Sequence, residues 1–232
     1  MNEASKAAAR LKREGNFQRW ITGEVLDIGA GNDPIMPDAR VWDIPDGDAQ
    51  KLESLEDASY DTVFSSHCLE HMRDPQEALA NWWRVLKPGG HLVILVPDAD
   101  LYEQGIWPSV FNPDHKWTFN ISTDRTWSPR NKNLVELVKY LPGRSVLSVR
   151  LVGEGYDGAP GSVPIRDRTL GPAEAAIELV MQKVDHVLPL LSPLASLVPC
   201  PSCRQLQLTI VGLKKDKHLQ VRCAECGTIS SI

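Results

Sequence analysis

Residues 24–34 read EVLDIGAGNDP, and this stretch decides the fold. A short apolar run stops at Gly29, which is typical of a buried parallel strand that enters a glycine turn. Gly29 and Gly31 form a Gly-x-Gly turn, where glycine is needed because the backbone bends sharply and approaches a ligand closely. The stretch predicts an α/β domain with a ligand site at the end of its first strand.

The segments on both sides of this stretch alternate between helix and strand patterns. Periodicity predicts helices at 5–20, 71–90 and 133–143, and strands at 39–44, 59–66, 91–98 and 145–156. Residues 173–184 fit either state, and we prefer a strand because a hairpin return would give the sheet an edge. Such alternation points to a mostly parallel sheet with right-handed crossovers and an antiparallel edge.

An acidic residue, Asp43, ends the second expected strand twelve residues after Gly31. A carboxylate at this place can accept hydrogen bonds from both hydroxyls of a ribose. A dinucleotide site would also need a third glycine and a helix N-terminus aimed at the pyrophosphate. Asp33 and Pro34 follow instead, and Asp33 would repel a pyrophosphate. The residues therefore favour S-adenosylmethionine (SAM), which has a positive sulfonium and no phosphate, over NAD.

Four segments carry a family resemblance: VLDIGAGNDP (25–34), VWDIPDGDAQKL (41–52), SYDTVFSSHCLEHMRDPQEAL (59–79) and RVLKPGGHLVILVPD (84–98). In this order they resemble the successive motifs of class I SAM-dependent methyltransferases, and most of all the small-molecule branch called type 11. The resemblance covers about residues 20 to 100. It implies a Rossmann-like sheet and SAM as the cofactor. A softer likeness, in DLYEQGIWPSVFNPDHKWTF (100–119), is to relatives in bacterial cell-surface polysaccharide biosynthesis.

The resemblance also implies roles for individual residues. Asp43 would take the ribose hydroxyls, and the adenine amino group would face Asp48, although a turn-forming role is the simpler interpretation of Asp48. The methionine and ribose cradle would consist of Asp27, Gly29, Ala30, Gly31 and Asn32; the adenine wall would add Ala49 and Gln50, and Ser65, Ser66 and His67 would lie beneath the methyl group.

Two departures from the family pattern affect the adenine side. Only eight residues separate Gly31 from Arg40, so the first helix can be little more than a turn. Between Asp43 and Asp48 there is no room for the usual helix and strand. We therefore expect a sheet that is trimmed on the adenine side.

Methyl transfer needs alignment of the acceptor and exclusion of water, and a hydroxyl acceptor benefits from a base. The candidate catalytic residues are His67, His115 and Asp98, with a hydrogen-bonded structural role as the alternative for each histidine; His71 is read as structural. No Asn/Asp-Pro-Pro-Tyr motif of amino-group methylators is present, since SSHC stands at 65–68. By analogy with relatives, the expected acceptor is an oxygen on a small or saccharide-linked molecule.

Residues 99–130 form a long aromatic segment with little periodicity, and we read it as an acceptor-site insert rather than a loop packed on its own aromatics. With it, the expected methyltransferase domain covers residues 1–185. A linker is expected at 186–199, and a small C-terminal unit at 200–232.

Four of the chain's five cysteines lie in this C-terminal unit. They form two Cys-x-x-Cys pairs, Cys200 with Cys203 and Cys223 with Cys226, and 19 residues separate the pairs. This spacing is typical of a zinc ribbon with four thiolate ligands, and such a closed site would be structural. Two disulfides or a redox pair are the alternatives, and a reducing cytosol argues against the disulfides. The fifth, Cys68, is read as a packing residue.

Composition limits the class of protein. Apolar residues make up 42% and charged residues 24% of the 232 residues, and no apolar stretch is long enough for a membrane span. The charged N-terminus favours a cytoplasmic location. The net charge of -5 argues against nucleic acid as a partner and against RNA methylation. A second hypothesis is a methyltransferase-like scaffold whose ribbon binds a protein or RNA partner.

Overall fold

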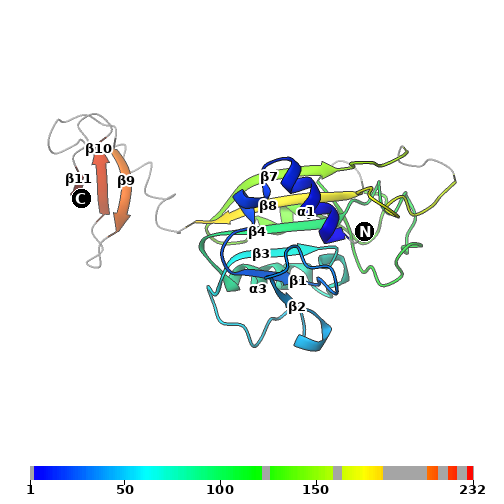
Figure 1. Cartoon of the computed structure of the whole chain (residues 1–232), viewed down its shortest axis with the longest axis horizontal. Coiled ribbons are helices and arrows are strands. Elements are labelled where there is room, and N and C mark those ends of the chain that lie inside the picture. The colour runs from blue at the N-terminus through cyan, green and yellow to red at the C-terminus, as the bar shows by residue number, and fades with distance from the viewer. Residues whose placement is uncertain are drawn as a thin grey trace. The chain divides into compact units, whose positions relative to one another are not determined.

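The computed structural model describes residues 3–121, 126–158 and 164–184, together with the backbone of three C-terminal strands. The chain divides into two compact units, residues 1–183 and 184–232. The first unit is built on a six-stranded sheet in the order β2-β1-β3-β4-β8-β7 (Figure 1). Its strands are β1 (Val25–Ile28), β2 (Arg40–Trp42), β3 (Tyr60–Ser66), β4 (Leu86–Pro97), β7 (Arg144–Val152) and β8 (Ala176–Lys183).

Strands β2, β1, β3 and β4 pair in parallel, and β8 pairs antiparallel with both β4 and β7. The expected mixed α/β sheet with mostly parallel strands is therefore confirmed, and residues 173–184 do supply a strand. The antiparallel strand is not at the edge, however. β8 lies between β4 and β7, because the chain forms β7 at the edge first and then returns antiparallel to it as β8.

Helices cover both faces of the sheet. Along β4, Leu92, Ile94 and Val96 pack on one face, against a core that contains Trp82 and Leu79 of α3 (Pro75–Val85). The alternate residues of β4 face a second core with α1 (Glu3–Arg13) and α2 (Phe17–Trp20). This two-residue alternation is what a strand buried on both faces requires.

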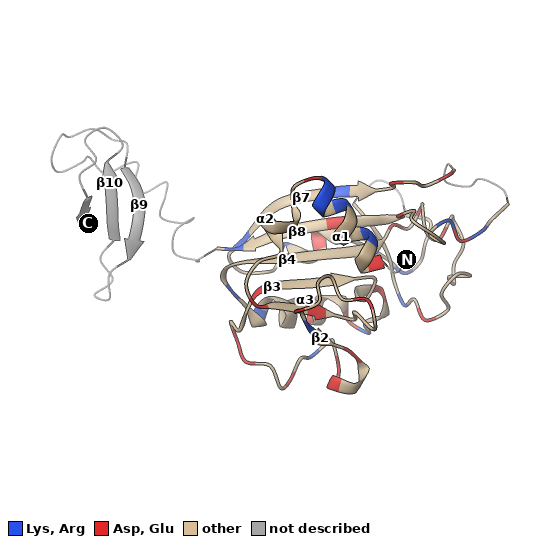
Figure 2. Cartoon of the chain, viewed as in Figure 1, with Lys and Arg blue, Asp and Glu red and all other residues tan. Residues whose placement is uncertain are grey.

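The expected single helix at 5–20 is two helices. The chain leaves α1 at Gly15, whose φ of 71° is the left-handed conformation that commonly ends a helix. The Asn16 amide donates to the Leu11 carbonyl at 2.9 Å and closes this turn. α1 is then held by two buried cations: Lys6 donates to the Thr169 and Ala173 carbonyls, and Arg10 pairs with Glu174 and Glu178. In Figure 2, α1 carries segments in blue, the colour of Lys and Arg.

The β2 side of the sheet is short, as the spacing between Gly31 and Asp48 predicts. No helix lies between β1 and β2, and only the single turn η1 (Ile44–Asp46) follows β2. The remaining elements of the first unit are η2 (Leu69–His71), α4 (Leu134–Val138) and the parallel pair β5 (Thr118–Asn120) and β6 (Asn131–Asn133). Among the residues that the structure describes, no helix has the length and apolar character to cross a membrane.

The second unit contains a three-stranded antiparallel sheet of β9 (Leu208–Leu213), β10 (Leu219–Cys223) and β11 (Ile229–Ser231). Cys200, Cys203 and Cys226 lie outside the described residues, and for Cys223 only the backbone at the end of β10 is described.

Candidate active site

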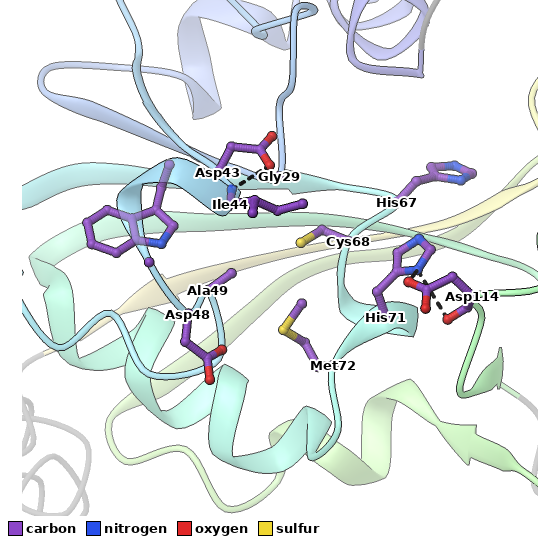
Figure 3. A pocket seen from close by; sticks show the side chains of 12 residues that line it. Gly29, Asp43, Ile44, Asp48, Ala49, His67, Cys68, His71, Met72 and Asp114 are labelled. Carbon is purple, nitrogen blue, oxygen red and sulfur yellow. Dashed lines mark hydrogen bonds and ion pairs between the residues drawn. The ribbon is translucent and has the colours of Figure 1, made fainter.

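Three cavities meet at the carboxyl ends of the parallel strands. The first has a volume of about 680 Å³ and is lined by residues of the turns after β1, β2 and β3 (Figure 3): Gly29, Trp42, Asp43, Ile44, Gly47, Asp48, Ala49, His67, Cys68, His71, Met72 and Asp114. The strand order changes direction here, and such crevices are where open α/β sheets bind ligands. A cavity of this size matches a small-molecule or cofactor site.

The glycine turn and Asp43 lie in direct contact. The Gly31 amide donates to Asp43 Oδ2 at 2.7 Å, and the Ile44 amide donates to Asp43 Oδ1, also at 2.7 Å. Gly29 has a φ of 78°, and a Cβ built on it would lie 2.6 Å from Cys68 Sγ. Only glycine fits there, so the backbone of the turn stays close to the cavity floor.

One side of the first cavity is formed by η1 and the turn at 47–49. Asp48 lines the cavity, and it also makes the turn: its Oδ1 accepts from the Gln50 amide at 2.9 Å, and its Oδ2 pairs with Arg73 at 2.8 Å. Ala49 lines the cavity too. Gln50 does not, because its side chain is buried against the start of α3, where its Oε1 accepts from the Asp74 amide.

A second cavity of about 210 Å³ continues from Gly29 beneath the N-terminal helix. It is lined by Glu3, Ala4, Asp27, Gly29, Ala30, Asn32, Asp33, Ser66 and His67. Asp27 is buried and accepts from the Ile35 amide at 2.7 Å. Burial raises the pKa of Asp27 to about 7, because the charged carboxylate loses its water shell. A cationic ligand in this cavity would offset that cost.

The third cavity, of about 480 Å³, lies on the far side of His67. It is lined by Glu3, His67, Glu70, His71, Tyr102, Asn112, His115, Asp167, Thr169, Leu170 and Gly171. His67 lines all three cavities, and its φ of 53° is unusual for a residue other than glycine. Such strain tends to be kept at functional sites. His67 therefore stands where a ligand of the first two cavities would meet a ligand of the third.

The structure separates the three catalytic candidates. His67 and His115 line the third cavity, and their rings flank that of Tyr102, with centroids 6.3 and 5.3 Å away. Burial lowers the pKa of His67 to about 3, which favours the neutral imidazole. Asp98 is not among the lining residues of these cavities. Its Oδ1 accepts from the Asp100 and Leu101 amides and closes the turn after β4.

Other expected site residues have structural contacts. The buried Ser65 donates its hydroxyl to the Ile28 carbonyl at 3.0 Å and ties β3 to β1. Within the aromatic insert, Phe119 is in the core and Trp117 lines a different cavity, with its indole nitrogen donating to the Met72 carbonyl at 2.9 Å. The insert thus supplies Tyr102, Asn112 and His115 to the third cavity, and much of its aromatic content packs against the protein.

Sequence reasoning missed several lining residues. Ile44 is 89% exposed at the mouth of the first cavity, and Glu3 and the 167–171 segment reach the site only through tertiary packing. Glu70 and His71 did carry a signal. The His-x-x-Glu-His spacing of residues 67–71 brings three potential ligands onto one turn at a strand end.

Comparisons with known proteins agree with this geometry. Residues 26–94 match the model of a family described as "Methyltransferase domain". An uncharacterized 37.1 kDa protein in a transposon of Streptomyces fradiae is 48% identical over 54 residues, which is 23% of this chain and 15% of that protein. A polyketide synthase-nonribosomal peptide synthetase of Pyricularia grisea is 28% identical over 182 residues, 76% of this chain and 4% of that protein.

The chain thus spans only 15% and 4% of the length of these two curated relatives. A SAM-dependent methyltransferase structure from Archaeoglobus fulgidus has 18% sequence identity and a TM-score of 0.47, covering 78% of this chain and 95% of that one. The matched segment, residues 26–94, contains β2, β3, most of β1 and β4, and most of the residues that line the first cavity, so this part of the chain is similar to the methyltransferase domain of that family.

Proposed function

We propose that the protein is a SAM-dependent methyltransferase. The observation that carries this proposal is the first cavity, in which the Gly29–Gly31 turn contacts the Asp43 carboxylate. His67 lines both this cavity and the third cavity, so the two adjoin at His67. In this arrangement the adenosine occupies the first cavity and the methionine part occupies the second. The methyl group then lies beside His67, facing an acceptor in the third cavity.

The match of residues 26–94 to a methyltransferase family supports this assignment independently of the cavity geometry. An open cavity also favours an enzyme over a scaffold, because a domain retained only for docking has no need of it. The test is calorimetric titration of the purified chain with SAM and with S-adenosylhomocysteine. Binding of both supports the proposal, and absence of both contradicts it.

We further propose that the acceptor atom is an oxygen of a small or saccharide-linked molecule. The third cavity supports this, since it is lined largely by groups that can hydrogen-bond hydroxyls, such as Glu70, Asn112 and Asp167. In-line attack by the acceptor oxygen forms the carbon–oxygen bond while the carbon–sulfur bond breaks and the sulfur keeps the electron pair. Incubation with labelled SAM and hydroxyl-bearing or amine-bearing acceptors distinguishes oxygen from nitrogen transfer.

Asp27 gives this proposal a pH signature. A cationic SAM beside Asp27 favours the carboxylate, so binding lowers its pKa from about 7 and releases a proton. SAM affinity is therefore expected to fall as pH drops below about 7 and to level off above it. Calorimetry at pH 7 in buffers of different ionisation enthalpy should detect release of about half a proton, since a group with a pKa of about 7 is half protonated there.

The matched control is Asp27→Asn, which keeps a side-chain oxygen for the Ile35 amide and cannot ionise. This variant should bind SAM without that proton release, and any remaining release measures the amino group of SAM itself. Equal release by both proteins would show that Asp27 does not face the cation.

For the C-terminal unit we propose a structural zinc ion held by Cys200, Cys203, Cys223 and Cys226, as their spacing indicates. Chain purified without chelators should contain about one thiolate-bound zinc, since four thiolates complete a tetrahedral site. Cys223→Ser should lose it, whereas Cys68→Ser, a change at the buried cysteine of the first unit, should keep it. Retention of the zinc by Cys223→Ser would contradict the proposal that these four cysteines bind it.

A further inference from the structure

We propose that Glu70, His71 and His115 form a binding site for a divalent first-row transition ion on the wall of the third cavity. Each residue offers one ligand atom, and these atoms all lie within 4.8 Å of one another. The two residues from η2 come from one turn, and His115 comes from the insert some 45 positions later. Two imidazoles and one carboxylate with open positions form a known ligand set for such ions.

The position of Glu70 is the first argument. Its side chain is 0% exposed, and among the residues that the structure describes no other residue donates a hydrogen bond to either of its carboxylate oxygens. A buried carboxyl without donors is costly, and a bound cation is a common way to offset that cost.

The arrangement around this carboxyl is the second argument. Glu70 Oε1 lies 3.8 Å from His71 Nε2, 3.8 Å from His115 Nε2 and 3.9 Å from His67 Nδ1. These separations are too long for hydrogen bonds. They do fit ligands of a shared ion, because atoms about 2.1 Å from one metal lie roughly 3 to 4 Å apart. Two imidazoles, those of His71 and His115, therefore lie around one carboxylate oxygen at the spacing of ligands of a shared ion.

The outer partners of the two histidines are the third argument. His71 Nδ1 lies 2.9 Å from Asp114 Oδ2, and His115 Nδ1 lies 2.7 Å from Glu103 Oε1. A carboxylate only accepts, so Nδ1 carries the proton and the Nε2 lone pair of each ring is directed at the site. A carboxylate behind each ligating imidazole is the usual support of a metal site.

The third cavity determines what the ion would do. All three ligands line that cavity, and of the three only His71 also lines the first, so an ion held by all of them faces the acceptor side. The ion binds the acceptor hydroxyl and lowers its pKa, the proton leaves to solvent, and the oxygen attacks the methyl carbon as the carbon–sulfur bond breaks. This role rests on the proposed methyl transfer, whereas the metal site itself does not.

The test is titration of the metal-stripped full chain with Co²⁺, followed by visible absorption. Co²⁺ bound to thiolates adds an intense charge-transfer band that a nitrogen and oxygen site lacks. This band distinguishes Co²⁺ bound at the cysteine cluster from Co²⁺ bound at the proposed site. The wild-type chain should show the nitrogen and oxygen spectrum, and Cys223→Ser should keep it. Glu70→Gln and His71→Asn should each weaken this binding about 100-fold or more, and Asp114→Asn about 10-fold or more.

His91→Asn is the matched control, because His91 lies on β4 away from the cavities and should leave Co²⁺ binding unchanged. His71 is less buried than Glu70, so His71→Asn decides the matter if Glu70→Gln does not fold. Absence of the nitrogen and oxygen spectrum in the wild type, or its persistence in His71→Asn, would overturn the metal site. Calorimetry with SAM on the same samples keeps the two proposals apart, since loss of SAM binding with intact Co²⁺ binding contradicts only the methyltransferase.

Discussion

Replacing Asp43 by alanine is expected to weaken SAM binding by about 10² to 10⁴-fold. The carboxylate would lose its hydrogen bonds to the ribose hydroxyls, and hydrogen bonds to a charged group contribute roughly 1.5–3 kcal/mol each. It would also lose its contacts with the Gly31 and Ile44 amides, which fix the turn against η1. Calorimetric titration with SAM measures the effect directly.

Asp46→Ala separates ribose recognition from loop integrity. Asp46 accepts from the Asp43 amide at 3.0 Å and pairs with Arg40 at 2.8 Å, but it does not line the first cavity. If Asp43 binds ribose, Asp46→Ala should retain most of the SAM affinity. Equal losses in the two variants would mean that Asp43 acts only by shaping the turn.

Gly29→Ala is expected to lower the free energy of unfolding by about 2–5 kcal/mol and to remove SAM binding. The left-handed φ of 78° is unfavourable for alanine, and the added methyl would lie 2.6 Å from Cys68 Sγ and 2.7 Å from Cys68 Cβ. The turn must then move away from β3, which would displace the backbone that lines the cavity. Urea unfolding and SAM calorimetry on the same protein measure both effects.

Gly89→Ala is the matched control for backbone strain. Gly89 has a φ of 85°, and a Cβ there meets nothing within 4 Å. Its replacement should therefore cost only the conformational penalty of about 1–2 kcal/mol and leave SAM binding intact. If the two variants lost equal stability, close packing against Cys68 could not be the reason for glycine at position 29.

The sequence predicted best what local chemistry determines. The strand before Gly29 and the acid at the end of β2 were identifiable because each depends on a few adjacent residues, and their pairing follows from parallel strands. The shortened adenine side was predictable from the number of residues between Gly31 and Asp48. The choice of strand for 173–184 was correct, although its place inside the sheet depends on how the hairpin with β7 docks.

What the sequence did not predict depends on tertiary contacts. His71 was interpreted as structural, because nothing in its own neighbourhood places His115 beside it. Trp117, within the aromatic insert, was expected at the acceptor site, yet its indole nitrogen donates to the Met72 carbonyl. The presence of aromatic residues in a segment does not determine which way each side chain points. The buried ion pairs of Arg10 in α1 could not be predicted either, because its partners Glu174 and Glu178 come more than 160 positions later in the chain.

The attachment of α1 has a consequence for how such an enzyme can change. Lys6 and Arg10 bind the N-terminal helix to the chain around residues 169–178, and both segments contribute walls to the third cavity. The first cavity, which we propose holds the adenosine, is lined for the most part by a separate stretch, residues 29–72. Substitutions in 167–171, which line the third cavity but neither of the other two, can therefore change which acceptor is admitted without altering the first and second cavities, so acceptor selectivity and cofactor binding are free to evolve at different rates.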